Sequence, residues 1–424
     1  MKFKYLFVFT LIFVLVLSAC APAAEAPAAE EPAAEAPAAE EPAAEEPVAE
    51  APGEDPCDAE WGCAVVEPGQ TVKIGMSSPM TGPYADFGID AENSGLIGVA
   101  DAGDVLGFTF ELVAEDDEGG AEGGAAVANK LVADPTFVAM AGPLFSGATA
   151  AAMPIYEAAG IPMMSPSATA GFLTAEGSRV FNRLPFVDPI QGKAAAEFMF
   201  NELGFTAIAV LHDGEDYGRG LATIVRDEFE ALGGTVTAFE GITPGEADYT
   251  PVLSTIAAQS PDAVYFGGYN QDGAVITNQM KEVGLEDATF FGCDGTWGAD
   301  YLSLTGANAE GSIHANTRAP EESEIKANFD EAYLSAYGVG PVVLSPFSYN
   351  SYDAVTILAN AVKAVAFVGE DGNLYVPRAA LVAEVRGTAG FVGVGSYTCD
   401  AIGECNTEGP AFEQVVDGEW VVLQ

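Results

Sequence analysis

Several short apolar runs of this chain end in loops whose side chains could bind a small charged molecule. Each run has the length of a β-strand, and the loops that follow carry hydroxyls, aromatic rings and one carboxylate: Ser146, Ser167, Thr169, Tyr217, Tyr269 and Asp294. Hydroxyls and helix-start N–H groups suit an anionic group, and a carboxylate suits a cation. Aromatic rings suit an apolar body. Together these groups match a free amino acid, which carries one charge of each sign.

Each of these residues also has a purely structural interpretation. Ser146 stands at the start of a predicted helix and could equally be an ordinary N-cap. Asp294 precedes Gly295 and could be a turn or cap residue. Tyr217 and Tyr269 could be core aromatics. The ligand-binding interpretation is favoured because all of these residues follow predicted strands.

The elements that must position these loops are indicated by the spacing of the apolar residues. Short apolar runs predict strands at 72–76, 108–114, 137–141, 161–165, 180–184, 207–212, 235–239, 263–267, 289–292 and 311–315. Apolar residues at spacings of three and four predict helices at 86–102, 125–133, 148–159, 190–203, 221–232, 249–259, 273–283, 321–337 and 347–368. The alternation of strand and helix implies an α/β fold with parallel sheets covered by helices on both faces.

The length of the chain favours two such sheets. Roughly 360 residues follow the N-terminal segments, which suits two domains better than one. We expect the first sheet within 70–187 and the second to begin near residue 188. In parallel open sheets the ligand lies beyond the carboxyl ends of the strands, so two facing sheets would form a cleft lined by the loops described above.

Composition and missing motifs disfavour several classes of function. The chain has 15 Lys and Arg against 63 Asp and Glu, and a formal net charge of −48. A nucleic-acid partner is not expected, because such binding depends on Lys and Arg that neutralise phosphates. An exported hydrolase is disfavoured because the two histidines, His212 and His314, lie in no H-E-x-x-H motif and near no G-x-S-x-G motif.

The first 56 residues predict export and tethering. Lys2 and Lys4 precede an apolar run at 5–17, and Leu17-Ser18-Ala19-Cys20 ends this segment. These features predict a secretory signal over 1–20, with Cys20 lipid-modified on the outer face of a membrane. The run is shorter than the ~20 residues of a spanning helix, which disfavours a single-pass anchor. Ala, Pro and Glu dominate 21–56, which predicts a disordered, extended tether rather than a binding segment.

The cysteines predict two local disulfides. Four of the six cysteines form two close pairs, Cys57 with Cys63 and Cys399 with Cys405. In an exported protein such pairs indicate disulfides. A metal site is the alternative, and it is disfavoured because no His lies near these cysteines. With Cys20 assigned to lipidation, Cys293 is left as a buried thiol, and neither a metal nor a cofactor is expected.

These loops, together with other motifs, resemble the branched-chain amino acid binding proteins of ABC transporters, the leucine-binding protein family with the type I periplasmic binding fold. The resemblance covers essentially all of 70–424. Its motifs occur in one order: 80–85 (MTGPYA), 127–130 (VANK), 155–157 (IYE), 165–169 (SPSAT), 212–213 (HD) with 217–218 (YG), and 267–269 (GGY). The resemblance implies a two-lobed α/β fold that closes like a Venus flytrap, with three crossovers between the lobes. Lobe 1 would comprise 70–187 and 318–393, and lobe 2 would comprise 188–317 and 394–424.

The same resemblance implies roles for individual residues. Ser146 and Thr169 would bind the ligand carboxylate, and Ser167 would add backbone contacts. Asp294 stands where well-known members have a glutamate that binds the ligand ammonium. The remaining expected contacts are aromatic or apolar side chains: Phe87, Leu144, Phe145, Tyr217, Tyr269 and Phe347.

Two departures from the family pattern bear on the choice of ligand. Asp294 is one methylene shorter than glutamate, so the ammonium must lie nearer or a water must intervene. Phe145 stands where some members have a smaller, disulfide-bonded cysteine, which changes the shape of the pocket. Relatives of this fold also bind amides, urea and aromatic acids, so the resemblance does not fix the ligand.

The resemblance implies that the protein captures a branched-chain or other small amino acid and delivers it to the permease subunits of an ABC transporter. It would act as a membrane-anchored, monomeric binding protein and not as an enzyme. One alternative is a sensory module for amides, urea or amino acids, and a less favoured one is an exported hydrolase. Neighbouring permease and ATPase genes would indicate uptake, whereas a neighbouring sensor kinase gene would indicate signalling.

Overall fold

The computed structural model describes residues 56–175 and 177–423. They belong to one compact unit, Glu54–Gln424. The predicted signal segment with Cys20, and the tether up to residue 55, lie outside the described residues. Within the described part of the chain, no helix is both long and apolar enough to cross a membrane.

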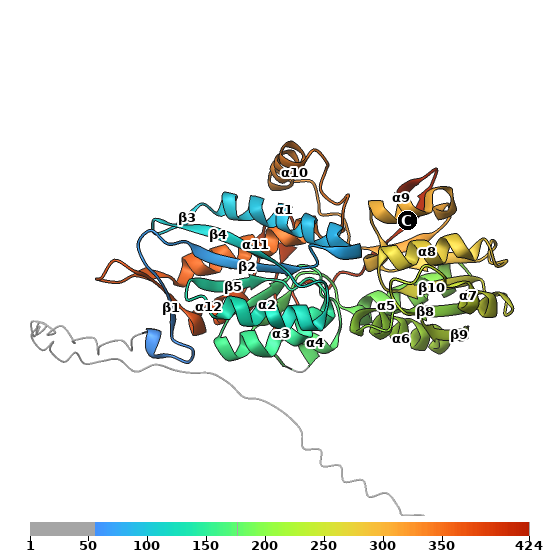
Figure 1. The fold of residues 1–424 in the computed structure, drawn as a ribbon, viewed down its shortest axis with the longest axis horizontal. Helices are drawn as coiled ribbons and strands as arrows, with labels where there is room; N and C mark the ends of the chain where they lie inside the picture. The colour runs from blue at the N-terminus through green and yellow to red at the C-terminus, as the bar shows by residue number, and fades with distance from the viewer. Residues whose placement is uncertain (1–55, 176, 424) are drawn as a thin grey trace, which may run out of the picture. The chain divides into compact units, whose positions relative to one another are not determined.

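The first part of the unit forms a six-stranded sheet (Figure 1). In spatial order its strands are β3 (Asp104–Val105), β4 (Phe108–Asp116), β2 (Val72–Ser78), β5 (Phe137–Ala141), β6 (Met163–Ser165) and β7 (Phe181–Arg183). Neighbouring strands are parallel except at the edge, where β3 is antiparallel to β4. The helical segments along this part of the chain are η1 (Pro56–Asp58), η2 (Gly82–Tyr84), α1 (Ala85–Ala102), α2 (Ala121–Val132), α3 (Ser146–Ala159) and α4 (Phe172–Ala175).

A second sheet has seven strands. In spatial order they are β18 (Glu419–Val422), β17 (Ala411–Val416), β12 (Ile313–Asn316), β11 (Thr289–Gly292), β10 (Ala263–Gly267), β8 (Ala207–His212) and β9 (Thr235–Gly241). Strands β8 to β12 pair in parallel, whereas β17 and β18 add an antiparallel edge. Its helical segments are α5 (Asp188–Glu197), the π-helical η3 (Phe198–Glu202), α6 (Asp216–Ala231), α7 (Thr250–Ala257), α8 (Asn270–Met280), η4 (Asp294–Thr296), α9 (Ala299–Thr305) and η5 (Gly306–Ala309).

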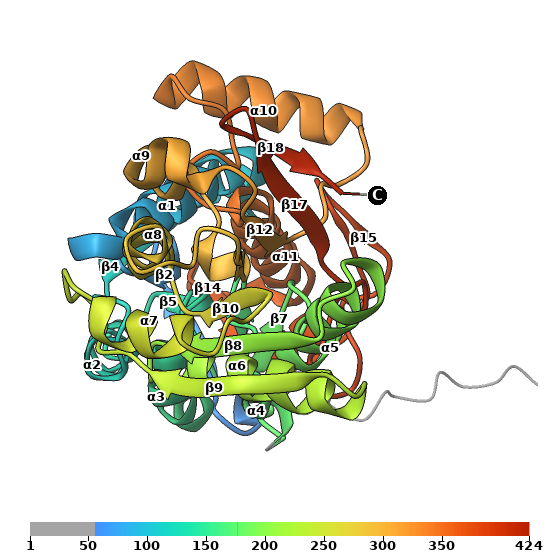
Figure 2. The same cartoon turned by 90° about the vertical axis from the view of Figure 1, so that its right-hand side faces the viewer.

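Helices cover both faces of each sheet. On the first sheet, α1 packs against β2 and β4, and α2 and α3 pack together on the opposite face (Figure 1). On the second, α6 packs against β8, β9 and β10, and apolar residues of α8 share a core cluster with residues of β10 and β11. Figure 2 shows β9, β8 and β10 side by side between these layers. This is the α/β layering that the sequence predicted.

The C-terminal helices return to the first sheet. Helix α11 (Ser348–Val365) contacts α1, β5 and β6, and α12 (Arg378–Arg386) contacts α11. The other C-terminal elements are α10 (Glu324–Tyr337), a small sheet of β1 (Cys63–Val66), β14 (Leu374–Pro377) and β13 (Phe367–Val368), and the pair β15 (Phe391–Val392) and β16 (Ser396–Tyr397).

The chain leaves the first sheet later than the lobe boundary expected at residue 394. The N–H of Gly395 donates to Asp353 of α11 at 2.7 Å, and the N–H of Cys405 donates to the carbonyl oxygen of Arg183 in β7 at 3.1 Å. Residues 394–405 therefore contact first-sheet elements, and the chain joins the second sheet only at β17.

Four predicted strands match the structure at both ends, namely β5, β8, β10 and β11. Helix α2, in contrast, begins at Ala121, four residues before its predicted start at 125. The reason is that Gly123 and Gly124 weaken the helical signal of the sequence, although their missing side chains bring α2 close to its neighbours. A Cβ atom on Gly124 would lie 2.5 Å from the carbonyl oxygen of Ala148.

The sheets, which are parallel as expected, also have antiparallel strands at their edges. Strands β17 and β18 are joined by a turn at Asp417 and Gly418, both with positive φ. A connection this short can only join antiparallel strands, because a parallel pair needs a crossover of a dozen or more residues. The single helix predicted at 190–203 also ends early, since α5 changes to a π-helical turn after Glu197.

Candidate functional site

One cavity brings together most of the predicted site residues. It is lined by Leu144, Phe145, Ser146, Ser167, Thr169, Tyr217, Tyr269, Asp294, Gly295 and Phe347. Nine of the ten residues expected to contact a ligand belong to this lining. The tenth, Phe87, is fully buried outside it, with its ring packed against those of Phe145, Tyr269 and Phe347.

The strand order explains why these loops meet. In the first sheet β2 lies between β4 and β5, and in the second β8 lies between β9 and β10. The direction of connection reverses at β2 and at β8, and loops on either side of such a switch point leave a crevice beyond the strand carboxyl ends. The loop after β5 leads to Ser146 at the start of α3, and the loop after β10 carries Tyr269.

Hydroxyls and a helix start form the first-sheet wall of the cavity. Ser146 is the first residue of α3, and its hydroxyl oxygen accepts the N–H of Ala170 at 3.3 Å. The hydroxyl of Ser167 donates to the carbonyl oxygen of Leu144 at 2.6 Å. The first N–H groups of a helix have no partner within the helix and attract an anion. This wall can therefore bind a carboxylate.

The opposite wall holds a buried carboxylate. Oδ1 of Asp294 accepts hydrogen bonds from the hydroxyl of Tyr217 and, at 2.8 Å, from Nε2 of Gln191. The N–H of Gly295 donates to the same Tyr217 hydroxyl at 3.3 Å. Burial raises the pKa of Asp294, and the hydrogen bonds from Tyr217 and Gln191 oppose that rise. A cation placed beside this group would favour its ionised form.

A second buried acid, Asp188, opens α5 beside this wall. It is 1% exposed, and among the described residues neither of its carboxyl oxygens has a partner with hydrogen-bond geometry. Its N–H donates to the carbonyl oxygen of Thr169 at 2.9 Å. Burial, and next the negative charge of Asp294, raise the pKa of Asp188 to about 8, while the nearby Thr169 side chain and Arg183 oppose this rise.

Aromatic rings close the remaining side of the cavity. The rings of Phe145 and Tyr269 stack with centroids 4.2 Å apart, and Tyr217 lies 5.5 Å from Tyr269. The ring of Tyr84 lies 4.9 Å from Tyr269, and its hydroxyl donates to Asp272 at 3.2 Å. Because Phe145 and Tyr84 belong to the first-sheet group and Tyr269 to the second, these rings join the two groups of elements across the cavity.

The position of Tyr217 depends on a close approach between α6 and β10. Gly218, the next residue, packs so tightly that a Cβ atom there would lie 2.4 Å from Oδ1 of Asp213 and 2.4 Å from the carbonyl oxygen of Gly267. At Gly220, two residues further along α6, an added Cβ atom would meet nothing within 4 Å other than its own helix and chain neighbours. The two glycines therefore form a matched pair for substitution.

We expect Gly218→Ala to destabilise the protein by about 1–3 kcal/mol, because α6 must move away from β10 to accept the methyl group. Gly220→Ala should instead stabilise it by about 0.5–1 kcal/mol, since alanine is the better helix former. Urea unfolding of the ligand-free protein measures both effects. Equal changes in the free energy of unfolding would show that the packing at Gly218 has no special role.

The described cysteines lie outside the cavity lining. The structure joins Cys57 to Cys63 and Cys399 to Cys405 by disulfides. Cys293 is a buried thiol whose Sγ donates to the carbonyl oxygen of Gly268 at 3.3 Å, and burial raises its pKa to about 12. In the described part of the chain, no group of three or more His, Cys, Asp or Glu side chains is arranged to hold a metal ion.

Four residues of the site region had no predicted role in ligand binding. Asp188 and Gln191 come from α5, Gly295 lines the cavity, and Tyr84 packs on Tyr269. No local pattern signalled Gln191, because its partner Asp294 lies 103 residues away. Tyr84 belongs to the 80–85 motif, but the motif alone gives no partner for its side chain.

Comparison with known proteins identifies relatives of this chain. A family model described as periplasmic binding protein matches residues 71–404. The leucine-, isoleucine-, valine-, threonine-, and alanine-binding protein of Pseudomonas aeruginosa is 33% identical over 298 residues, which are 69% of this chain and 78% of that protein.

Solved structures are similar over most of the chain. The leucine binding protein LivK from Thermotoga maritima has a TM-score of 0.76 and 27% identity, covering 84% of this chain and 98% of that one. The substrate binding protein LivJ from Streptococcus pneumoniae, in complex with isoleucine, has a TM-score of 0.72 and 26% identity, covering 84% and 99%. The fold and the order of its elements are thus shared with these structures.

Proposed function

We propose, from the premise that this chain belongs to the periplasmic binding protein family, that it captures a branched-chain or other small amino acid and delivers it to the permease of an ABC transporter. The Pseudomonas aeruginosa relative is named for binding five such amino acids, and the LivJ structure holds isoleucine. These similarities support the ligand class, and the cavity supplies the chemical argument.

The proposal is carried by one observation, that hydroxyls and a helix start face the same cavity as a buried carboxylate. A buried zwitterion needs a partner at each end, because burying an unpaired charge is costly. Ser146 and Thr169 would bind the carboxylate, and Asp294 would bind the ammonium. Phe145, Tyr269 and the other apolar lining residues would contact an aliphatic side chain.

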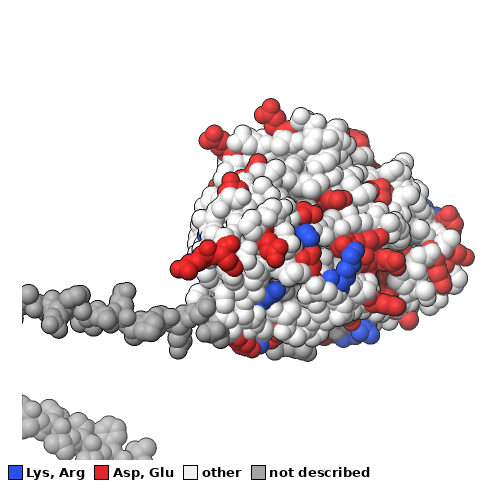
Figure 3. Space-filling view, turned by 60° about the vertical axis from the view of Figure 1, so that its left-hand side comes forward, with Lys and Arg blue, Asp and Glu red and all other residues white. Residues whose placement is uncertain are grey.

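Capture would couple ligand binding to closure of two lobes. The lining comes from elements of both sheets, and the chain passes between the sheets after β7, β12 and β16. Short connections of this kind act as hinges in domain closure. We propose that the closed form presents both lobes to the permease. Acidic side chains outnumber basic ones on the face in Figure 3, so a basic surface on the permease would speed association.

We also propose that the protein is exported, that Cys20 carries the lipid anchor, and that 21–56 tethers a monomeric binding domain to the membrane. These steps rest on the signal and tether patterns of the sequence. Membrane attachment would keep the binding domain near its permease. We assign the protein no catalytic step.

The thermal unfolding midpoint tests the ligand class directly. We expect leucine, isoleucine or valine to raise the midpoint more than charged amino acids, amides, urea or benzoate do. A ligand at 100 times its Kd stabilises the folded state by about 2.7 kcal/mol. If no amino acid raises the midpoint while urea or an amide does, the proposed ligand class is wrong.

A further inference from the structure

A fully buried arginine donates hydrogen bonds to the backbone of the loop at 166–170, which contributes to the cavity lining. Arg183, the last residue of β7, has a side-chain exposure of 0%. Its Nη1 donates to the carbonyl oxygens of Ala168 and Ala170, both at 2.9 Å. These two carbonyl groups flank Thr169. The guanidinium therefore fixes the backbone on both sides of a residue that lines the cavity.

Glu404 is the counter-charge of this arginine, although 221 residues separate the two in sequence. Its Oε1 accepts a hydrogen bond from Nη2 of Arg183 at 3.0 Å, and its Oε2 lies 3.0 Å from Nε. The hydroxyl of Thr174 donates to Oε1 of Glu404 at 2.6 Å. Removing one partner of a buried ion pair leaves an uncompensated charge, so Arg183 depends on Glu404 for its position.

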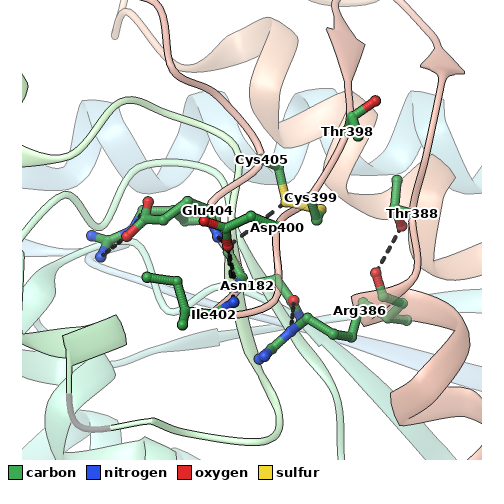
Figure 4. Close-up of a disulfide and its surroundings, with 12 residues drawn as sticks. Asn182, Arg386, Thr388, Thr398, Cys399, Asp400, Ile402, Glu404 and Cys405 are labelled. Atoms are coloured by element: carbon green, nitrogen blue, oxygen red, sulfur yellow. Dashed lines mark hydrogen bonds and ion pairs between the residues drawn. A yellow bond between two sulfur atoms is a disulfide. The ribbon is translucent and has the colours of Figure 1, made fainter. Parts of the chain in front are cut away.

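The disulfide closes the short loop that carries Glu404. Cys399 and Cys405 are the ends of this loop, and Asp400 and Glu404 lie within it (Figure 4). Oδ1 of Asp400 accepts the N–H groups of the loop residues Ile402, Gly403 and Glu404, each at 2.9 Å. The loop is thus closed by a disulfide and stabilised internally by hydrogen bonds to Asp400.

The same loop is also bonded to β7. The N–H of Arg183 donates to the carbonyl oxygen of Gly403 at 2.9 Å, and the N–H of Cys405 donates to the carbonyl oxygen of Arg183 at 3.1 Å. These bonds form an isolated parallel bridge between Arg183 and Glu404. The disulfide loop therefore sets the backbone of Glu404 directly beside the arginine that it must neutralise.

We propose that Arg183 and Glu404 are positioning residues for ligand binding, and that the Cys399–Cys405 loop holds Glu404 in the place from which it acts. The proposal rests on the proposed function, because it takes Thr169 to be a contact of the ligand carboxylate. Without Glu404, the guanidinium loses its counter-charge and keeps only the Thr174 hydroxyl and the two carbonyl oxygens as partners, which weakens its hold on the 166–170 backbone. Ligand affinity should then fall even where the fold is retained.

Isothermal titration with L-leucine tests this role at a temperature well below the unfolding midpoint of every variant. We expect Glu404→Ala, and the double variant Cys399→Ser with Cys405→Ser, to raise the Kd by about tenfold or more, because small displacements of a binding group are costly. Glu404→Gln should fall between these and the wild type, since its amide oxygen still accepts the bond from Nη2. The matched control is Cys57→Ser with Cys63→Ser, which removes the other disulfide and should lower the midpoint without changing the Kd.

Two results would overturn the positioning role. One is a folded Glu404→Ala protein whose Kd matches that of the wild type. The other is a control variant whose Kd rises as much as that of the Cys399 and Cys405 variant. If Glu404→Ala does not fold, Glu404→Gln and the cysteine variant decide between the same outcomes. Failure of the proposed function gives a different result, because the wild-type protein itself would then bind none of the amino acids tested.

Discussion

Replacing Asp294 with alanine is expected to weaken amino-acid binding by about 100-fold or more. In the wild-type protein Asp294 is 2% exposed and is the carboxylate of the cavity lining. A ligand ammonium group buried opposite an alanine would have no counter-charge, which costs ~3–5 kcal/mol. Calorimetric titration with L-leucine measures the change in Kd.

The informative comparison is with Ser146→Ala. Ser146 offers one neutral hydroxyl, and the N–H groups at the start of α3 would continue to bind the ligand carboxylate. Loss of one hydrogen bond to a charged group costs about 1.5–3 kcal/mol, so the Kd should rise less than for Asp294→Ala. Asp287→Ala, which removes an exposed carboxylate near the start of β11, should leave the Kd unchanged. Equal losses at Asp294 and Ser146 would indicate a ligand without an ammonium group.

The second large effect is a dependence of stability on pH that arises from the titration of Asp188. Its pKa is raised to about 8 in the folded protein, against about 3.9 in an unfolded chain. Between these two values the folded state holds a proton that the unfolded state releases. The contribution of Asp188 to stability therefore decreases as pH rises, by about 1.4 kcal/mol per pH unit. Above the folded pKa the loss is complete and constant.

Asp188→Asn should remove this dependence, because an amide does not titrate. We expect the variant to match the wild type near about pH 4 and to be more stable than it by roughly 4 kcal/mol near about pH 7. Urea unfolding of ligand-free protein at both pH values measures the difference. The opposite sign is expected for Asp262→Asn, because backbone N–H groups of Thr206 and Ala207 help to lower the pKa of Asp262. If Asp188→Asn changes the free energy of unfolding equally at both pH values, the raised pKa of Asp188 is contradicted.

Much of the local structure could be predicted because it depends on local patterns. Strands such as 137–141 and 263–267 are apolar runs bounded by glycine, proline and polar residues, and the structure has them at these positions. Since parallel strands place their carboxyl ends at one edge, the residues after the strands could be expected to share a site. The six residues expected on this ground line one cavity: Ser146, Ser167, Thr169, Tyr217, Tyr269 and Asp294. Leu144, Phe145 and Phe347, which the family resemblance implied, line it too.

Other features of the site depend on contacts that no local pattern specifies. Gln191 reaches Asp294 from 103 residues away, and Tyr84 reaches Asp272 from 188 residues away. The sequence shows the donors and acceptors but not which of them meet. The family resemblance implied that Phe87 contacts the ligand, yet its ring lies outside the lining and packs against the rings of Phe145, Tyr269 and Phe347.

The sequence by itself determined the α/β alternation, the loops that carry the polar groups, and the chemical complement of those groups. These depend on residue type and on spacing of a few positions. Only the tertiary structure decided that the disulfide loop lies beside β7, that Glu404 neutralises Arg183, and that Asp188 is buried next to Asp294. Burial and pairing of charges arise from segments that are far apart in the chain, so they are fixed only when the whole unit packs.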